Sequence, residues 1–329
     1  KDTNGPLYHR VDIEIPLFPF DIKETKEFLL KEKNFDIDDK SIADIYMVLG
    51  GVAKYLSYLD NKLSISQNIN KLFFSLHSPL YGEFDALFKS LFYDKASIHK
   101  KIIDVLLSKR SGFTMLELES LIDEVKLFTL RNHIDELIDT GFIKPIGRYN
   151  HASKNTKFIV IDSFCLFFHK WVQALSKNDI ANQIDYFETK STSHDYIIWQ
   201  GYAFEILCMA NIDLYLKARG LSAGVKSIGY WDYVSNDALE KGAQIDILIE
   251  YIGNTYDIVE CKYYNDEFTI DKDYASNLQN KKEKFITHAI KNKKYDLKMI
   301  MLSTYGTKIN QYYNQIPIAK DIKLEDLMN

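Results

Sequence analysis

The chain has 329 residues, is 46% hydrophobic and 14% aromatic, and carries a formal net charge of −5. This composition excludes a disordered chain, and the length favours two or three domains because single cores seldom grow beyond about 250–300 residues. The acidic balance argues against a protein that coats DNA non-specifically. No apolar run approaches the roughly 20 residues that cross a bilayer, and the polar start lacks a signal segment, so we expect a cytoplasmic protein without a membrane partner.

The charge is distributed unevenly along the chain. Residues 95–160 carry 11 Lys and Arg against 8 Asp and Glu, whereas residues 1–94 carry 11 against 15. Residues 161–189 and 190–329 are each acidic by two charges, so only the second segment is basic. Three widely spaced cysteines show neither pairing nor metal-ligand spacing and are predicted to be buried thiols in a reducing compartment: Cys165, Cys208 and Cys261.

Residues 1–94 are predicted to form a helical, lid-like subdomain after an extended start. Residues 1–20 include "VDIEIPLFPF", which alternates apolar and polar side chains before two prolines. From Asp21 onward the apolar side chains recur with helical periodicity, and Glu24 stands three residues after Asp21, as in a capping box. A Gly-Gly pair at 50–51 interrupts this periodicity, and the segment contains no obvious site.

Residues 95–161 follow a different pattern. Amphipathic helices are predicted in "SIHKKIIDVLLSKR" and "KLFTLRNHIDELIDTGFI", with a short helix between them that Thr114 caps. Two strands then flank a polar tip at 150–156. Three helices followed by a hairpin are typical of the winged helix-turn-helix, which is the fold predicted for this segment.

A winged helix offers its third helix and its wing for contact with DNA or RNA. Asp135, Glu136 and Asp139 lie at the end of the third helix and argue against a strong DNA reader. Packing of the winged helix against other protein domains therefore stays open as an alternative. The residues that are candidates to reach a groove are Lys126, Arg131 and His133 in the third helix and Arg148, Lys154 and Lys157 in the wing.

The last domain is predicted at 193–329, after an aromatic-rich helical connector at 162–192. A long helix extends through "HDYIIWQGYAFEILCMANIDLYLKARG" to Gly220, and three strands follow, the last two joined by a turn at Gly253-Asn254. A helix, a fourth strand and a short tail, "IKLEDLMN", complete an αβββαβ order. The predicted fold class is thus multidomain: an all-α part, a winged helix and an α/β domain.

The predicted hairpin "QIDILIEYIGNTYDIVECKYY" carries charged side chains within two apolar strands. Side chains of a strand alternate between its faces, so Glu260 and Lys262 share one face of their strand. The three isoleucines within 245–249 share a face of the other strand, with Asp246 opposite them. Pairing about the turn then predicts that Asp246 lies beside Glu260 and Lys262.

Such a cluster of carboxylates is costly without a counter-charge, because ionised groups at close range repel each other. A divalent cation removes that cost, and Mg²⁺ or Mn²⁺ prefers carboxylate oxygens, retained waters and substrate phosphates. With Lys262 facing the metal-bound water or the scissile phosphate, the arrangement suits hydrolysis of a phosphodiester. The alternative from the residues alone is a surface ion pair of Glu260 and Lys262 beside a polar Asp246, worth about 0–1 kcal/mol.

This residue order resembles the PD-(D/E)XK nuclease-like superfamily, in which a helix with a Glu precedes an Asp and a Glu-x-Lys pair across a hairpin. The helix Glu matches Glu205 in "GYAFEIL". The resemblance implies that Asp246 and Glu260 bind the metal, that Glu205 is an accessory ligand, and that Lys262 orients or activates the water. Ile245 stands where the family motif has a proline.

Nearly the whole chain also resembles a prokaryotic family of STAND-like AAA+ ATPases. The matching segments are, in order, "GPLYHR", "IPLFPF", "YMVLGGVAKYL", the winged helix, "WQGYAFE", "GAQIDILIE", "ECKYY" and "STYG". In that family a P-loop NTPase domain precedes the lid, so the resemblance implies an upstream ATPase partner and a nucleotide facing Arg10, which is otherwise a surface arginine. No G-x-x-x-x-G-K-[ST] occurs here, so ATP binding and hydrolysis are expected only with the NTPase domain present.

Three functional hypotheses follow. In the first, the C-terminal domain cuts DNA or RNA. In the second, the nuclease-like and winged-helix parts are catalytically silent and bind partners, which the acidic net charge favours. In the third, both parts serve an ATPase as sensor and lid. The substrate and its strandedness stay open. The oligomeric state also stays open, with an oligomer among the alternatives.

Overall fold

A computed structural model shows a mixed α/β chain. The described residues are 17–75, 77–151, 153–181, 185–235, 237, 240–291 and 294–329. Most of the extended start predicted at 1–20, with Arg10, and the wing-tip residue 152 lie outside them. Within the described part, no helix combines the length and the apolar character needed to cross a bilayer.

Short helices make up the first part of the chain, as the periodicity predicts. The capping box is confirmed: the Asp21 carboxylate accepts from the Glu24 amide at 2.7 Å, and the Glu24 carboxylate accepts from the Asp21 amide at 2.9 Å. The helices are α1 (Ile22–Glu27), which continues as a π turn at Phe28–Glu32, α2 (Asp39–Leu49), α3 (Ala53–Ser57), α4 (Ile65–Phe73) and α5 (Glu83–Phe92).

Three helices and a pair of antiparallel strands follow. Thr114 caps the second of these helices, because its hydroxyl accepts from the Glu117 amide at 3.3 Å while the Glu117 carboxylate accepts from the Thr114 amide at 2.7 Å. The strands of the pair are joined by the polar tip. The elements are α6 (Ala96–Leu107), β1 (Phe113–Thr114), α7 (Met115–Leu121), α8 (Leu127–Asp139), β2 (Ile143–Arg148) and β3 (Lys157–Val160).

Asn211 divides the helix predicted from residue 194 to Gly220. The two resulting helices are α12 (His194–Ala210) and α13 (Ile212–Arg219). The prediction of a single helix was therefore wrong, whereas its predicted end at Gly220 is confirmed. The Asn211 side-chain oxygen accepts from the Ile22 amide at 2.9 Å, and its nitrogen donates to the Leu207 carbonyl at 2.8 Å. The break therefore ties the N-terminal helices to α12.

The connector and the C-terminal part supply the remaining elements. The prediction of a short tail from residue 322 was wrong. These residues end a strand that is parallel to β7 and then form a last helix. The elements are α9 (Ser163–Trp171), α10 (Lys177–Ala181), α11 (Tyr186–Lys190), β4 (Val225–Tyr233), β5 (Ala243–Tyr251), β6 (Thr255–Lys262), α14 (Lys272–Phe285) with a π turn at Ile286–Ile290, β7 (Asp296–Ser303), α15 (Gln311–Gln315), β8 (Ile318–Lys323) and α16 (Leu324–Met328).

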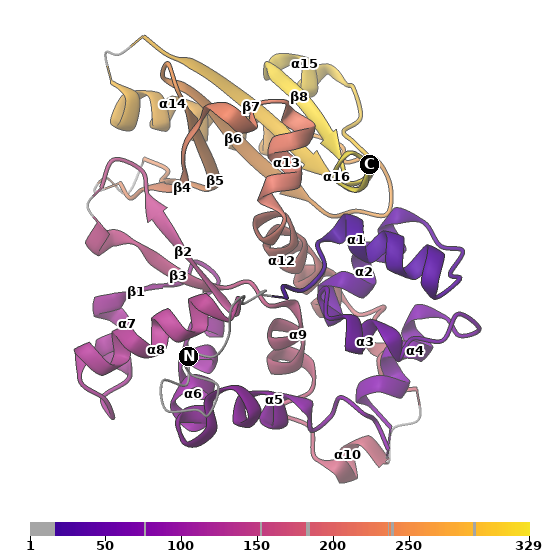
Figure 1. Cartoon of the computed structure of the whole chain (residues 1–329). Coiled ribbons are helices and arrows are strands. Elements are labelled where there is room, and N and C mark those ends of the chain that lie inside the picture. Colours follow the sequence, from indigo (N-terminus) through magenta and orange to yellow (C-terminus); the bar gives the residue numbers. More distant parts are fainter. Residues whose placement is uncertain are drawn as a thin grey trace.

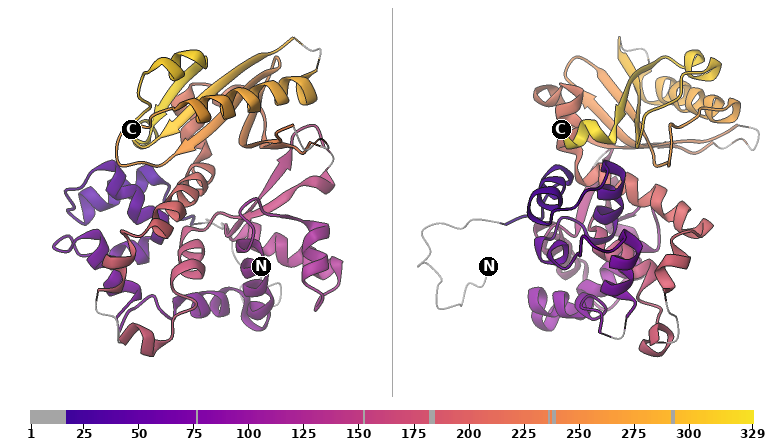
Figure 2. Two further views of the ribbon diagram at one scale, coloured as in Figure 1. Left: turned by 180° about the vertical axis from the view of Figure 1, so that it is seen from behind. Right: turned by 90° about the vertical axis from the view of Figure 1, so that its right-hand side faces the viewer.

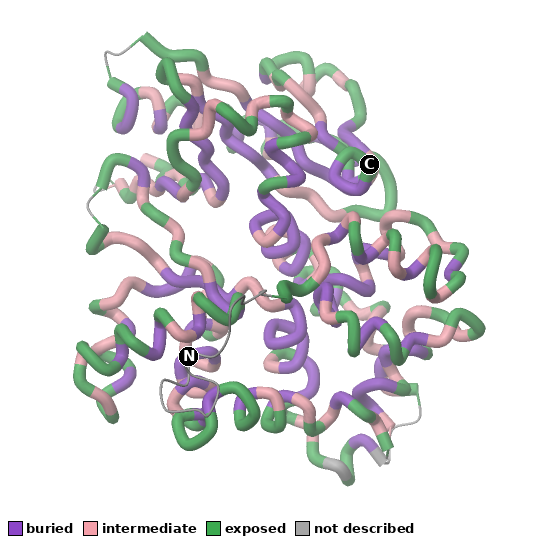
Figure 3. Tube along the Cα trace, viewed as in Figure 1, coloured by how far each residue is buried: buried purple, intermediate pink, exposed green. Residues whose placement is uncertain are grey.

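An eight-stranded sheet of the described residues has the order β1-β3-β2-β4-β5-β6-β7-β8. The β5–β6 hairpin is confirmed, with positive φ at both Gly253 and Asn254. In Figure 1 the strands β4 to β8 lie at the top and α12 passes down the centre. Both views of Figure 2 show α1 and α2 directly below the sheet, next to α16. Figure 3 shows α9 and α12 as largely buried.

The sheet separates two apolar cores. The larger core contains Ile247, Ile249 and Val259 together with the central helices α9 and α12. The smaller core contains Leu248, Ile258 and the inner face of α14. Consecutive residues of β5 and β6 therefore face different cores, as expected of a strand covered on both sides.

Gly229 allows β2 and β4 to join. The two strands pair in parallel at Gly147–Gly229 and Arg148–Tyr230, so the hairpin of the basic segment continues the C-terminal sheet. A Cβ atom at Gly229 would lie 2.2 Å from the Gly147 carbonyl oxygen, whereas a Cβ atom at Gly147 would meet nothing within 4 Å. The contact thus depends on the missing side chain of only one of the two glycines.

We expect Gly229→Ala to lower the free energy of unfolding by about 1–3 kcal/mol, because the β2–β4 contact has to open. Gly147→Ala, in the facing strand, should change it by no more than about 0.5 kcal/mol. Urea denaturation of both variants and the wild type tests this difference. Equal effects of the two substitutions would show that the close approach of β2 and β4 at Gly229 does not contribute to the free energy of unfolding.

Candidate active site

The predicted site residues lie where two strands separate. Pairing of β5 with β6 extends from the turn to Ile247–Val259 and stops there. Strand β6 stays paired with β7 as far as Lys262, while β5 continues along β4. A fork therefore opens between β5 and β6, and Asp246 and Glu260 are the first residues beyond it.

A β-bulge in β5 lies at the same place. Gly229 pairs with Leu248 and Trp231 pairs with Ile245, so β4 advances two residues while β5 advances three. The extra residue of β5 bends the strand and changes the direction of its side chains, as bulges do near functional sites.

The bulge overturns one expectation about the faces of β5. Ile245 packs in the core beside α14, whereas Ile247 and Ile249 pack in the core beside α12. The prediction that these three isoleucines share a face was wrong, because the bulge interrupts the alternation between them. Asp246, at the interruption, lines a cleft against α12.

Glu260 is held from α14. Its residue is only 7% exposed, yet one carboxylate oxygen accepts from the Tyr274 hydroxyl at 2.8 Å and the other lies 2.5 Å from the Lys281 ammonium. A carboxylate buried in a sheet is costly unless it is paired and hydrogen-bonded. Tyr274 and Lys281 supply both requirements from within the chain.

Lys262 shares the α14 side with Glu260, as the alternation predicts. Its ammonium lies 4.4 Å from the centre of the Tyr274 ring and 5.5 Å from that of Phe268. Burial lowers the pKa of Lys262, while the neighbouring Glu260 opposes the shift. Tyr274 thus contacts both members of the Glu-x-Lys pair.

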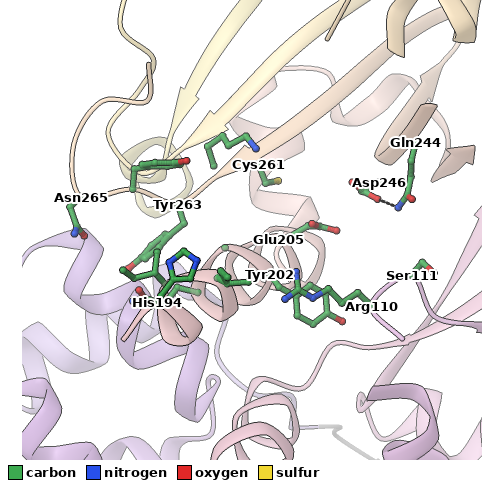
Figure 4. Close-up of a pocket in the computed structure, with 16 residues that line it drawn as sticks. Arg110, Ser111, His194, Tyr202, Glu205, Gln244, Asp246, Cys261, Tyr263 and Asn265 are labelled. Atoms are coloured by element: carbon green, nitrogen blue, oxygen red, sulfur yellow. Dashed lines mark hydrogen bonds between the residues drawn. The ribbon is translucent and has the colours of Figure 1, made fainter. Parts of the chain in front are cut away.

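Glu205 approaches the fork from α12. Burial, Asp246 and Glu260 raise its pKa from 4.5 to about 8, against the opposing charges of Lys281 and Arg110. Among the described residues it has no hydrogen-bond or ion-pair partner, whereas Asp246 accepts a hydrogen bond from Gln244. Figure 4 shows the carboxyl groups of Glu205 and Asp246 directed toward each other.

A cleft of about 580 Å³ is lined by Glu205, Asp246 and Lys262, whereas Glu260 lies outside its lining. Its walls come from α12, from the ends of β5 and β6, and from the loop between α6 and β1. That loop contributes Arg110 and Ser111, and the Arg110 guanidinium lies 5.0 Å from the centre of the Tyr202 ring (Figure 4). Sequence analysis missed Arg110, because nothing local in "LLSKRSG" indicates that the loop reaches a distant sheet.

The basic candidates of the segment 95–161 are placed differently. Lys126, Arg131 and Lys154 are exposed. Arg148 is used inside the chain: its guanidinium donates to the Asp232 carbonyl at 2.9 Å, and its Nε lies 2.5 Å from an Asp232 carboxylate oxygen. The Lys157 ammonium lies 4.2 Å from the centre of the Tyr230 ring.

His133 cannot reach a groove, because it is only 5% exposed. It belongs instead to a set with His99 and Glu136, the one group of three His, Cys, Asp or Glu among the described residues whose ligand atoms lie within 4.8 Å of one another. Glu205, Asp246 and Glu260 do not converge this closely. His133 and Glu136 are three residues apart on one helix, which was the only sequence signal for this set.

Comparisons of the chain with models of protein families, with curated proteins and with solved structures find no match. What the cleft does is therefore inferred from its own residues. It combines carboxyl groups from α12 and β5 with a half-buried lysine of β6 and with an arginine from the basic segment. These groups suit a cation and a phosphate-bearing ligand.

The free energy of unfolding should fall as pH rises from about 5 to above 8 because of Glu205. Between its ordinary pKa of 4.5 and the folded value of about 8, the folded chain keeps a proton that the unfolded chain has released. Glu205→Gln removes this titration, so its stability should depend less on pH over that interval. Urea denaturation across the interval measures the difference.

The exposed Glu325→Gln serves as the control and should follow the wild-type pH dependence. Parallel curves for Glu205→Gln and the wild type would contradict the raised pKa.

Proposed function

We propose that the chain carries a metal-dependent nuclease site of the PD-(D/E)XK type, which hydrolyses phosphodiester bonds of DNA or RNA in the cleft at the β5–β6 fork. The observation that carries the proposal is the cleft, in which the carboxyl groups of Glu205 and Asp246 lie together with Lys262 and Arg110. Such a convergence of acidic and basic groups in an open cleft is not required by a structural ion pair, and burial with the neighbouring carboxylates raises the pKa of Glu205 to about 8.

The order of elements supports this proposal. Helices α12 and α13, strands β4, β5 and β6, helix α14 and strand β7 follow the αβββαβ order, with two helices in place of the first one. The Glu, the Asp and the Glu-x-Lys pair lie on α12, β5 and β6. The elements α6-β1-α7-α8-β2-β3 follow the order expected of a winged helix. We extend the proposal to the likeness with STAND-like AAA+ ATPases, in which these parts belong to a larger ATPase.

The donor atoms of the cleft fit Mg²⁺ or Mn²⁺, which prefer carboxylate oxygens. Asp246 and Glu260 would hold the ion, with Glu205 as an accessory ligand. Once bound, such an ion polarises phosphate and lowers the pKa of a coordinated water. Glu205, which lacks a partner among the described residues, offers the carboxyl group whose proton a cation would displace.

The remaining residues of the cleft suit a polyanionic substrate. Lys262 lines the cleft with its ammonium held against Tyr274, a fixed position from which it can orient a water or a phosphate oxygen. Arg110 faces the same space from the basic segment, and guanidinium groups bind phosphate in a bidentate manner. The two carboxyl groups of the cleft are thus accompanied by one lysine and one arginine.

We expect the wild type to cleave single- or double-stranded DNA or RNA with Mn²⁺ or Mg²⁺. Asp246→Asn and Glu260→Gln should lower the rate by about 100-fold or more, because each removes a metal ligand. Lys262→Met should lower the cleavage rate by a similar factor, because it removes the ammonium group that can donate a proton or orient the water or the phosphate. Labelled oligonucleotides resolved on gels measure these rates.

Two substitutions on the neighbouring elements α14 and β7 control for purity and folding. Asp273→Asn lies on exposed surface of α14, and Lys298→Met removes a half-buried lysine of β7 that pairs with Asp296. Both should cleave at the wild-type rate. Equal cleavage by the site variants and the wild type would assign the activity to a contaminant, and no cleavage by any of them would reject the nuclease.

A specific observation favours a second function, a catalytically silent nuclease-like and winged-helix module that binds partners. Lys281 and Tyr274 already balance the buried Glu260, so the sheet needs no metal to be stable. In this case the cleft retains the charges of a nuclease site without its ion. The role of Lys281 distinguishes the two functions.

Lys281→Met should lower the free energy of unfolding by about 3–5 kcal/mol without metal, because it leaves Glu260 buried and unpaired. If the site is a nuclease, Mn²⁺ should restore part of the lost melting temperature. If the module is silent, Mn²⁺ should have no effect. Lys284→Met, on the same helix, breaks a more exposed pair with Glu240 and should cost no more than about 1 kcal/mol.

A further inference from the structure

A cluster of two histidines and a glutamate lies between α6 and α8, outside the cleft. The Glu136 oxygen Oε2 lies 2.8 Å from His99 Nε2 and 3.2 Å from His133 Nδ1. His99 is fully buried and His133 is 5% exposed, while the Glu136 side chain is 36% exposed. Two imidazoles therefore converge on one carboxylate oxygen at the edge of a core.

The hydrogen bonds of His99 determine which of its nitrogens carries a proton. Its Nδ1 lies 2.9 Å from the Lys95 carbonyl oxygen, which can only accept, so Nδ1 donates. In the neutral ring Nε2 then carries a lone pair.

The neutral ring leaves an electrostatic problem at Nε2. Its lone pair faces a carboxylate oxygen 2.8 Å away, and these two atoms make no aligned hydrogen bond. Two acceptors at this distance repel each other, and among the described residues nothing donates to Nε2. A cation bound to both atoms turns this repulsion into attraction.

We propose that His99, His133 and Glu136 bind a divalent transition-metal ion of the zinc class. Ligand atoms about 2.0–2.2 Å from tetrahedral zinc lie about 3.3 Å apart. The two spacings to Glu136 are 2.8 and 3.2 Å, and all the ligand atoms lie within 4.8 Å of one another. Imidazole nitrogens favour zinc over the oxygen-preferring Mg²⁺ and Mn²⁺. The site is therefore different in chemistry from the cleft and does not depend on the proposed nuclease.

The surroundings of the cluster are those of a metal site. The bond from His99 Nδ1 to a backbone carbonyl orients the ring, as outer partners of metal-bound histidines do. Phe92 stacks on His99 with ring centres 3.8 Å apart, and Lys95 holds the other Glu136 oxygen at 2.8 Å. Glu136 and Lys95 line an open depression of about 700 Å³, through which a water or an exogenous ligand can reach the Glu136 carboxylate.

The metal would join two helices of the basic segment. His99 comes from α6, and His133 and Glu136 come from α8 (Figure 1). A three-residue cross-link between them stabilises the segment that bears the exposed Lys126 and Arg131.

The test uses the whole chain after treatment with a chelator and dialysis. Zn²⁺ titration by calorimetry should show about one site per chain, and Co²⁺ should give the visible absorption of a four-coordinate site. His133→Gln and Glu136→Gln should weaken Zn²⁺ binding at least about tenfold and abolish the Co²⁺ bands. Zinc should raise the melting temperature of the wild type and not of these variants.

His169→Gln is the matched control, because His169 also pairs with a carboxylate of α6, Asp104, but without a second histidine. It should bind Zn²⁺ as the wild type does. Equal Zn²⁺ affinity of His133→Gln and the wild type would overturn the proposal. If the variants fail to fold, X-ray absorption at the zinc edge of the wild type decides: a shell with two imidazoles supports the site, and a shell without imidazole rejects it.

Discussion

The charge of Glu260 is the constraint on which the C-terminal part of the molecule depends. The residue lies in the second half of a central strand, is 7% exposed, and belongs to a sheet covered on both faces. A carboxylate in that position requires a cation and hydrogen-bond donors. Helix α14 meets this requirement with Lys281 and Tyr274, and Tyr274 in turn holds Lys262. The position of α14 is thus coupled to the chemistry of the cleft.

The cleft itself is built from segments that lie far apart in the sequence. The pairing of β2 with β4 fixes the basic segment against the C-terminal sheet. This pairing is possible because Gly229 has no side chain at the point where the two strands meet. The loop after α6 then places Arg110 opposite Asp246 and Glu205. Asn211 ties the N-terminal helices to α12, which carries Glu205.

Local signals in the sequence predicted much of this structure. The capping residues Asp21 and Thr114, the turn at Gly253-Asn254 and the alternation that places Glu260 and Lys262 together depend on neighbouring residues alone. The proximity of Asp246 to Glu260 was predicted from pairing about the turn, and that of Glu205 to both was implied by a family resemblance. Burial raises the pKa of Glu205, and the charges of Asp246 and Glu260 add to this effect.

The remaining features depend on tertiary contacts that no local pattern records. The bulge at Asp246 arises from the register with β4, so strict alternation misassigned Ile245. The helix break at Asn211 is stabilised by the distant Ile22, and the last strand forms because β7 offers an open edge. Lys281 and Arg110 were missed for the same reason: their partners are remote in sequence.

The most direct test of the central claim is a crystal structure of the chain with Mn²⁺, read from its anomalous scattering. The nuclease proposal predicts a peak between Asp246 and Glu260, with Lys281 displaced from Glu260. No peak in the cleft at saturating Mn²⁺, with Lys281 still bound to Glu260, would contradict it and leave the cleft as part of a binding module.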